Sequence, residues 1–194
     1  MSPRITVATI LLGVGTIALL AAPGGSSPFA PNYTSDGQLV LPSDYREWIF
    51  LSSGLGMTYQ PPGAQGEQRA PAFTNVFVNP AAYRSFVSTG KWPDKTMLVL
   101  EIRTAASKGS INQGGSYQSG VLAVEGEVKD LSKFPGTGWA FFAFGKSSTG
   151  KMLPPSQDCY ACHAEHGAVD NTFVQFYPAL LEIAKQKGTV KGDR

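Results

Sequence analysis

Several features that would identify other kinds of protein are missing from this sequence. Only two of its 194 residues are cysteines and two are histidines, and no internal repeat is visible. Charged residues make up 15% of the chain, the formal net charge is +2, and no basic stripe appears. This sparse charge argues against a nucleic acid as partner. The scarcity of cysteine is no obstacle to folding, because a chain of this length can bury a core without disulfides.

The scarce residues are concentrated in one place. The run Cys159-Tyr160-Ala161-Cys162-His163 contains both cysteines and one histidine, and His166 follows three residues later. C-x-x-C-H is the attachment motif of c-type haem. On a helical turn, residues three and four apart share one face, so both thiols and the imidazole can address one porphyrin. The motif predicts one covalent haem c per chain, with thioethers from Cys159 and Cys162 and with His163 as the axial iron ligand.

Three other chemistries are compatible with these residues. Cys159, Cys162, His163 and His166 would suffice for zinc, but structural zinc sites usually take their ligand pairs from two separated segments. A redox dithiol would require a C-x-x-C beside a βαβ pattern, and no such pattern is visible. A structural disulfide is common in exported proteins but leaves the adjacent histidine unexplained. The pattern therefore favours haem over these alternatives.

The N-terminal segment predicts export. Residues 1–24 read as a secretion signal, with Arg4 ahead of an apolar stretch and small residues after it. Export to the periplasm agrees with the motif, because haem c is assembled after export. The apolar stretch is long for a cleaved signal, so an uncleaved membrane anchor is the alternative. We expect one haem domain over residues 30–188 and a disordered tail over 189–194.

Hydrophobic patterning predicts a mixed fold. Alternating β-branched and aromatic residues predict four main strands, near residues 73–78, 96–104, 120–129 and 138–145. Short loops join them, apart from a helix that begins at Asn79-Pro80 and ends before Gly90, so the sheet should be largely antiparallel. Helices are also expected over residues 44–51 and 171–187, the second of them broken at Pro178. The expected class is α+β, with haem c between the sheet and the C-x-x-C-H helix.

The order of these segments resembles the cytochrome P460 family, which includes cytochrome c′-β. The similarity covers nearly all of the expected haem domain, and the order of the motifs is more specific than C-x-x-C-H alone. The other matching stretches are L-P-S-D-Y-R-E-W at 41–48, the strand and helix from Phe73 to Gly90, L-E-I at 100–102, V-E-G-E-V-K-D at 124–130, W-A-F-F at 139–142 and F-V-Q-F-Y-P at 173–178. The resemblance implies an antiparallel β fold with flanking helices, usually a homodimer, whose haem iron is five-coordinate with an open distal position.

One position departs from the P460 enzymes. Those members join a lysine side chain to the porphyrin and oxidise hydroxylamine, whereas c′-β members lack this bond and bind nitric oxide in an apolar pocket walled by phenylalanines. The family's lysine directly precedes a strand glutamate, and here Leu100 precedes Glu101. Leucine has no nucleophilic nitrogen, so the usual cross-link is not expected. Lys95 would replace it only if the strand register slipped, which would also misplace the buried face.

The resemblance also indicates residues of the distal pocket. It implies a proton-accepting role for Glu125, since an apolar pocket raises the proton affinity of a carboxylate. It further implies a pocket wall formed by Leu100 with Phe73 or Phe77. A solvent-facing strand glutamate and ordinary core phenylalanines are the alternatives. His166 lies on the same helical side as His163 and is poorly placed to reach the opposite haem face.

Two functional classes follow from these features. The first is an exported cytochrome that binds nitric oxide or a related small nitrogen ligand, with hydroxylamine oxidation as its enzymatic variant and a small redox protein as partner. The second is a low-spin electron carrier with a methionine as sixth ligand, for which Met57, Met97 and Met152 are candidates. The resemblance favours the first class.

Overall fold

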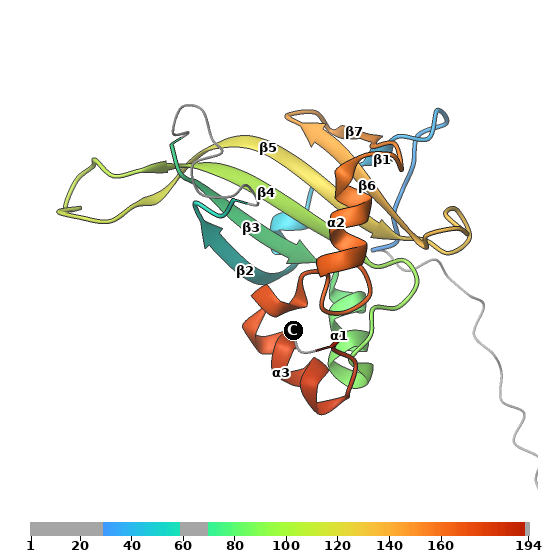
Figure 1. Ribbon diagram of the computed structural model, residues 1–194. Coiled ribbons are helices and arrows are strands. Elements are labelled where there is room, and N and C mark those ends of the chain that lie inside the picture. The colour runs from blue at the N-terminus through green and yellow to red at the C-terminus, as the bar shows by residue number, and fades with distance from the viewer. Residues whose placement is uncertain (1–28, 59–69, 193–194) are drawn as a thin grey trace, which may run out of the picture.

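The computed structural model describes residues 29–58 and 70–192. A single antiparallel sheet forms the centre of the domain (Figure 1). Over these residues the sheet has seven strands in the order β1-β7-β6-β5-β4-β3-β2, and every pairing is antiparallel. From β2 to β7 each strand pairs with the next one along the chain, as short connections require. The strands are β1 (Leu39–Val40), β2 (Ile49–Leu55), β3 (Ala72–Val78), β4 (Met97–Ala106), β5 (Tyr117–Lys129), β6 (Trp139–Gly145) and β7 (Thr149–Met152).

The helices lie on one face of the sheet and beyond one of its ends. Helix α2 (Asp158–His166) packs on β6, while α3 (Pro178–Gln186) contacts both α1 (Pro80–Thr89) and β2 (Figure 1). Two short 3₁₀ turns, η1 (Tyr45–Glu47) and η2 (Val174–Phe176), precede β2 and α3. The predicted α+β class with an antiparallel sheet and flanking helices is confirmed.

Local signals placed some elements correctly and others wrongly. Helix α1 starts at Pro80 and is closed by Gly90 in a left-handed conformation, as predicted. The expected break at Pro178 is confirmed, because η2 ends before it and α3 begins at it. The helix expected over residues 44–51 is wrong: only η1 is helical there, and Ile49–Leu55 instead pairs with β3. Strand β7 is not among the strands that the sequence predicts.

The two faces of the sheet bury separate cores. On the side of α1 and α3, one core gathers around the fully buried Phe86 and Trp92, whose ring centroids lie 4.3 Å apart. The other face covers a second core that includes Met97, Val99 and Val128. Strand alternation produces this division, because successive side chains of β4 point to opposite faces. A residue's parity along β4 or β5 therefore decides which core it joins.

A buried carboxylate stabilises the second face. Glu101 is 2% exposed and accepts hydrogen bonds from Tyr45, Arg46 and Arg103. Burial alone raises the pKa of Glu101, but the hydrogen bonds from Tyr45 and the two arginines outweigh it and hold the pKa below its ordinary value. Because its pKa is lower in the folded state than in the unfolded state, the carboxylate stabilises the fold at pH values above the unfolded-state pKa. This stabilisation is lost as the pH falls from the unfolded-state pKa through the folded-state pKa.

We therefore expect Glu101→Gln to lower the free energy of unfolding at neutral pH by roughly 1.5–3 kcal/mol, the typical value of hydrogen bonds to a charged group. The difference between variant and wild type should shrink below about pH 4, where a carboxylate of ordinary pKa takes up its proton. Urea unfolding at several pH values measures both effects. Glu182→Gln is the control, since Glu182 pairs with Lys185 on the surface of α3 and should matter little. A pH-independent difference would contradict this assignment.

The last described residues attach the C-terminus to two other segments. Thr189 hydrogen-bonds through its amide to Ala184 and through its hydroxyl to the carbonyl of Gly90 (2.7 Å). The amide of Lys191 donates to the carbonyl of Ala168 (2.7 Å), in the loop after α2. These contacts fall within the stretch where the sequence predicted a disordered tail. They connect the end of α1, the end of α3 and the loop behind the C-x-x-C-H helix.

Candidate functional site: a cavity between the sheet and the C-x-x-C-H helix

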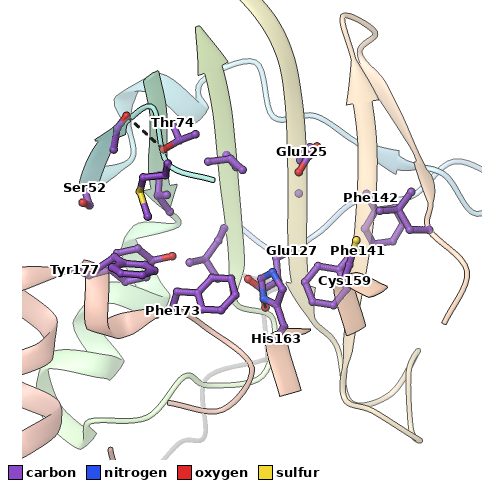
Figure 2. Close-up of a pocket in the computed structure, with 18 residues that line it drawn as sticks. Ser52, Thr74, Glu125, Glu127, Phe141, Phe142, Cys159, His163, Phe173 and Tyr177 are labelled. Carbon is purple, nitrogen blue, oxygen red and sulfur yellow. Dashed lines mark hydrogen bonds and ion pairs between the residues drawn. The ribbon is translucent and has the colours of Figure 1, made fainter. Parts of the chain in front are cut away.

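A cavity with about 860 Å³ of empty space, part of it open to solvent, lies between the sheet and α2. The sheet supplies one wall and the opposite wall comes from α2 and the segment around η2 (Figure 2). The lining residues are Ser52, Gly54, Met57, Thr74, Val76, Leu98, Leu100, Glu125, Gly126, Glu127, Phe141, Phe142, Leu153, Cys159, His163, Phe173, Phe176 and Tyr177.

Strand alternation builds the sheet wall. Leu98 and Leu100 of β4 face the cavity, and the register places them directly opposite Glu127 and Glu125 of β5. Phe141 of β6 is the neighbour of Glu127 on its other side. The wall is therefore apolar at β4 and β6, and its polar groups are the two carboxyl groups on β5 and the hydroxyl groups of Ser52 on β2 and Thr74 on β3. No lysine is among the residues that line it.

Helix α2 carries the C-x-x-C-H motif and is anchored through its middle. Tyr160 is buried, its hydroxyl donates to the carbonyl of Leu153 (3.1 Å), and its ring meets Phe141 edge-on at 4.8 Å. Asp158 in the first turn suits the positive end of the helix dipole. The anchor fixes which side of α2 faces the cavity, and Cys159 and His163 lie on that side.

The imidazole of His163 is fixed in orientation. Its ring lies between Phe141 and Phe173, with centroid distances of 4.5 and 4.3 Å (Figure 2). Nδ1 lies 2.7 Å from the carbonyl oxygen of Asn171, so a proton on Nδ1 is donated to that oxygen. This hydrogen bond leaves Nε2 as the nitrogen available to a metal, which is the arrangement expected of a metal-ligating histidine.

The loop after α2 presents the Asn171 carbonyl. Asp170 adopts a left-handed conformation (φ 51°), and its carboxylate accepts a hydrogen bond from Nζ of Lys129 (2.9 Å). On the other side, the hydroxyl of Thr172 accepts a hydrogen bond from the indole of Trp92 (2.7 Å). The Asn171 carbonyl, which accepts the hydrogen bond from His163, therefore lies between two residues, Asp170 and Thr172, that are both hydrogen-bonded to the body of the domain.

The two cavity carboxyl groups differ in their surroundings. Glu125 is an exposed residue, but partial desolvation of its carboxyl group raises its pKa, and the positive charge of a protonated His163 opposes this rise. Glu127 is more deeply buried, so its pKa is also raised, against the influence of a much closer His163. Oε1 of Glu127 lies 3.4 Å from Nδ1 of His163 and makes no hydrogen bond. Figure 2 shows Glu127 beside the imidazole and Glu125 further along the same strand.

The cysteines fit a haem better than the alternative chemistries. Both are free thiols and partly buried. Reactive dithiols depend on a lowered thiol pKa, whereas burial raises the pKa of Cys159. Within residues 29–58 and 70–192, no group of three or more His, Cys, Asp or Glu side chains is arranged to hold a metal ion, so the four candidate zinc ligands do not converge.

Of the seven predicted site residues, four line the cavity and three do not. Leu100, Glu125, Cys159 and His163 contribute to its walls, and Cys162 follows Cys159 on α2. Phe73 and Phe77 do not line it, because on β3 the cavity-facing residues are Thr74 and Val76, which alternate with them.

Phe77 instead packs against the second core, with Tyr45 at a centroid distance of 5.8 Å. The cavity phenylalanines are Phe141, Phe142, Phe173 and Phe176, which the sequence assigned to a strand and a helix but not to the site.

Of the three methionines that could be the sixth ligand, only one lies at the cavity. Met97 is fully buried in the core of the opposite sheet face, and Met152 lies on β7 outside the cavity lining. Only Met57, which is 42% exposed, lines the cavity among the described methionines. Lys95 is also excluded from the cavity, because its ammonium group bonds to Asp130 and Ser132 at the turn before β4.

An apolar cavity closed by a C-x-x-C-H helix, with a histidine whose Nδ1 is already bonded to a carbonyl, defines the class of c-type cytochromes. The sequence model of the cytochrome P460 family matches residues 42–174. The chain belongs to the cytochrome P460 family, and this membership implies a haem of the c type. No curated protein matches the chain.

The secretion signal predicted over residues 1–24 lies outside the described residues. Among the residues that the structure describes, no helix is both long enough and apolar enough to cross a membrane. The family is typically exported, which agrees with the predicted signal.

Proposed function

We propose that the protein is an exported cytochrome with one covalent, five-coordinate haem c that binds nitric oxide or a related small nitrogen ligand. The observation that carries this proposal is the cavity wall at Leu100, which is apolar and contains no lysine. The proposal extends to a homodimer in the periplasm that exchanges electrons with a small redox protein.

The chain's own residues would hold the haem at three points. Cys159 and Cys162 supply the thiols for the thioethers, and His163 supplies Nε2 to the iron. When bound, the haem offers one iron coordination position that no protein side chain occupies. The rings of Phe141 and Phe173 keep the imidazole from turning, and the Asn171 carbonyl fixes its tautomer.

The sheet wall favours an uncharged ligand. Val76, Leu98 and Leu100 offer no hydrogen-bonding side chain, so a polar molecule placed there loses hydration without compensation. A diatomic gas has little hydration to lose. Of the two described carboxyl groups that line the cavity, Glu125 is the one without a histidine contact, and it is available to accept a proton if a protic substrate enters.

The location of the lysines supports an uncross-linked haem. Lys95 is engaged with Asp130 at the far end of β4, and Lys129 bonds to the carbonyl of Trp92 and to Asp170. No lysine occurs in the parts of the sequence that the structure leaves undescribed. None of the described lysines lines the cavity, so a bond from a lysine nitrogen to the porphyrin would require a lysine to move into it.

The proposal is tested by an optical titration of the reduced protein with nitric oxide. We expect a high-spin reduced spectrum, reversible formation of a nitrosyl complex and recovery of the starting spectrum when the gas is removed. A low-spin reduced spectrum that nitric oxide does not change would contradict the proposal and favour the electron-carrier alternative.

A single substitution resolves that alternative, because Met57 is the methionine that lines the cavity. Met57→Leu should leave the reduced spectrum high-spin and change the nitric oxide affinity by less than about tenfold, since the side-chain volume is nearly conserved. Met152→Leu, outside the cavity, serves as the control. If the wild type is low-spin and only Met57→Leu becomes high-spin, Met57 is the sixth ligand and the five-coordinate assignment is wrong.

A further inference from the structure

Glu127 is a mostly buried acid, and its Oε1 has no hydrogen-bond donor. Its side chain is 11% exposed, and Oε1 has no hydrogen bond although it is shielded from solvent. Its cross-strand neighbours are Leu98 on β4 and Phe141 on β6, which cannot pair with a charge. Burial of a carboxylate in such surroundings costs several kcal/mol, so the fold alone would be better served by an apolar residue.

The imidazole of His163 lies beside this carboxyl group. Nδ1 lies 3.4 Å from Oε1 of Glu127 and 2.7 Å from the carbonyl of Asn171. The carbonyl is at normal hydrogen-bonding distance, and the carboxyl oxygen is somewhat beyond it. One N–H group therefore faces two acceptors, of which one is a carboxyl group.

The surroundings strengthen this second contact. The imidazole lies between Phe141 and Phe173, so little water screens the charge of Glu127 from the ring. Electrostatic interactions are stronger in such low-dielectric surroundings. A carboxylate near the N–H of a metal-bound imidazole makes the imidazole a stronger electron donor to the metal.

We propose that Glu127 is a positioning residue that acts on the haem iron through His163. Its carboxylate draws the Nδ1 proton toward itself, increases the electron donation from Nε2 and thereby stabilises the oxidised iron. Glu125, two residues along the same face of β5, lacks this contact and has no such role. The inference rests on the proposed function in requiring a five-coordinate haem with His163 as the axial ligand.

Glu127→Gln removes the carboxylate but keeps the length of the side chain. The frequency of the iron–histidine stretch, measured by resonance Raman on the reduced holoprotein, should fall because the bond weakens. The midpoint potential should rise, and a tenfold change in the reduction equilibrium corresponds to about 59 mV for one electron. Glu127→Asp, which retains the charge on a shorter side chain, should lie between the wild type and Glu127→Gln in both measurements.

Glu125→Gln is the matched control, because it removes a carboxylate from the same face of the same strand. Loss of a nearby negative charge alone would raise the midpoint potential in both Gln variants. Only action through His163 lowers the iron–histidine stretch, so that frequency should change in Glu127→Gln and not in Glu125→Gln. An unchanged frequency in Glu127→Gln, or an equal change in both variants, overturns the proposal.

The test also separates this inference from the proposed function. A wild-type protein without an iron–histidine band has no five-coordinate, histidine-ligated reduced haem, which overturns the proposed function and this inference with it. A wild-type band with no response to either Glu127 variant refutes only the role of Glu127. If Glu127→Gln does not take up haem, Glu127→Asp is compared with the wild type instead. An iron–histidine frequency in Glu127→Asp equal to that of the wild type then overturns the inference.

Discussion

Replacing both Cys159 and Cys162 by alanine should abolish covalent attachment of the haem completely. These are the only cysteines in the chain, so no other thiol can form a thioether. Denaturation in acid and an organic solvent should release all haem from the double variant and none from the wild type. Mass spectrometry of the denatured, reduced wild-type chain should retain the mass of one haem, provided that the protein is produced in cells that mature c-type cytochromes.

The single variants should be intermediate. Cys159→Ala and Cys162→Ala each keep one thiol, and each should retain a haem bound through a single thioether, with a shifted absorption spectrum. Replacing Cys159, which lines the cavity, should also enlarge it, whereas Cys162 is not among the lining residues. A wild-type chain that contains zinc, or no metal, after expression in such cells would exclude the haem assignment.

The second large effect concerns catalysis. We expect the wild-type protein to oxidise almost no hydroxylamine. The resemblance matches Leu100 to the cross-linking lysine of the P460 enzymes, and Leu100 faces the cavity. The wild-type protein should therefore have the spectrum of an ordinary, uncross-linked haem c and should oxidise hydroxylamine no faster than unrelated mono-haem proteins with an open iron site. A red-shifted cross-linked spectrum, or efficient turnover, would contradict this prediction.

Leu100→Lys introduces the missing amine, but the register of the sheet complicates its effect. Glu125 is the direct cross-strand neighbour of Leu100, so a lysine at position 100 would pair with it. The double variant Leu100→Lys, Glu125→Gln leaves the amine without that partner. We expect it to form a porphyrin cross-link under peroxide more readily than the single variant, with the altered spectrum and chain mass as the measurements.

Much of the site could be predicted because its signals are local. The C-x-x-C-H motif lies within five consecutive residues and needs no knowledge of the rest of the fold. Helix α1 could be predicted equally well, since Pro80 and Gly90 mark its two ends. The structure places Leu100 on the cavity face of β4, opposite Glu125, and the absence of the cross-link stays a prediction.

The errors arose where long-range pairing decides the structure. Tyr45, Trp48 and Ile49 are spaced as on a helix, but pairing with β3 converts the stretch from Ile49 onward into a strand. Alternation correctly grouped Phe73 with Phe77 but could not say which face of the sheet the helices cover. Only the position of α2 determines that this pair faces away from the cavity.

Glu127 was overlooked for a similar reason. It has the same parity as Glu125 on β5, so alternation does place both on one face. What distinguishes them is the distance to His163, a residue 36 positions further along the chain. That distance depends on how α2 docks on β6, and no pattern within β5 contains this information.

A protein that ended at Gly188 would retain α3 but would lose the hydrogen bonds of Thr189 to Gly90 and of Lys191 to Ala168. The loop that presents the Asn171 carbonyl to His163 would then be fixed at fewer points. Truncation of the C-terminus, or an affinity tag that replaces these residues, would thus loosen the iron ligand without touching the haem motif. A tag joined after Arg194 leaves these hydrogen bonds intact.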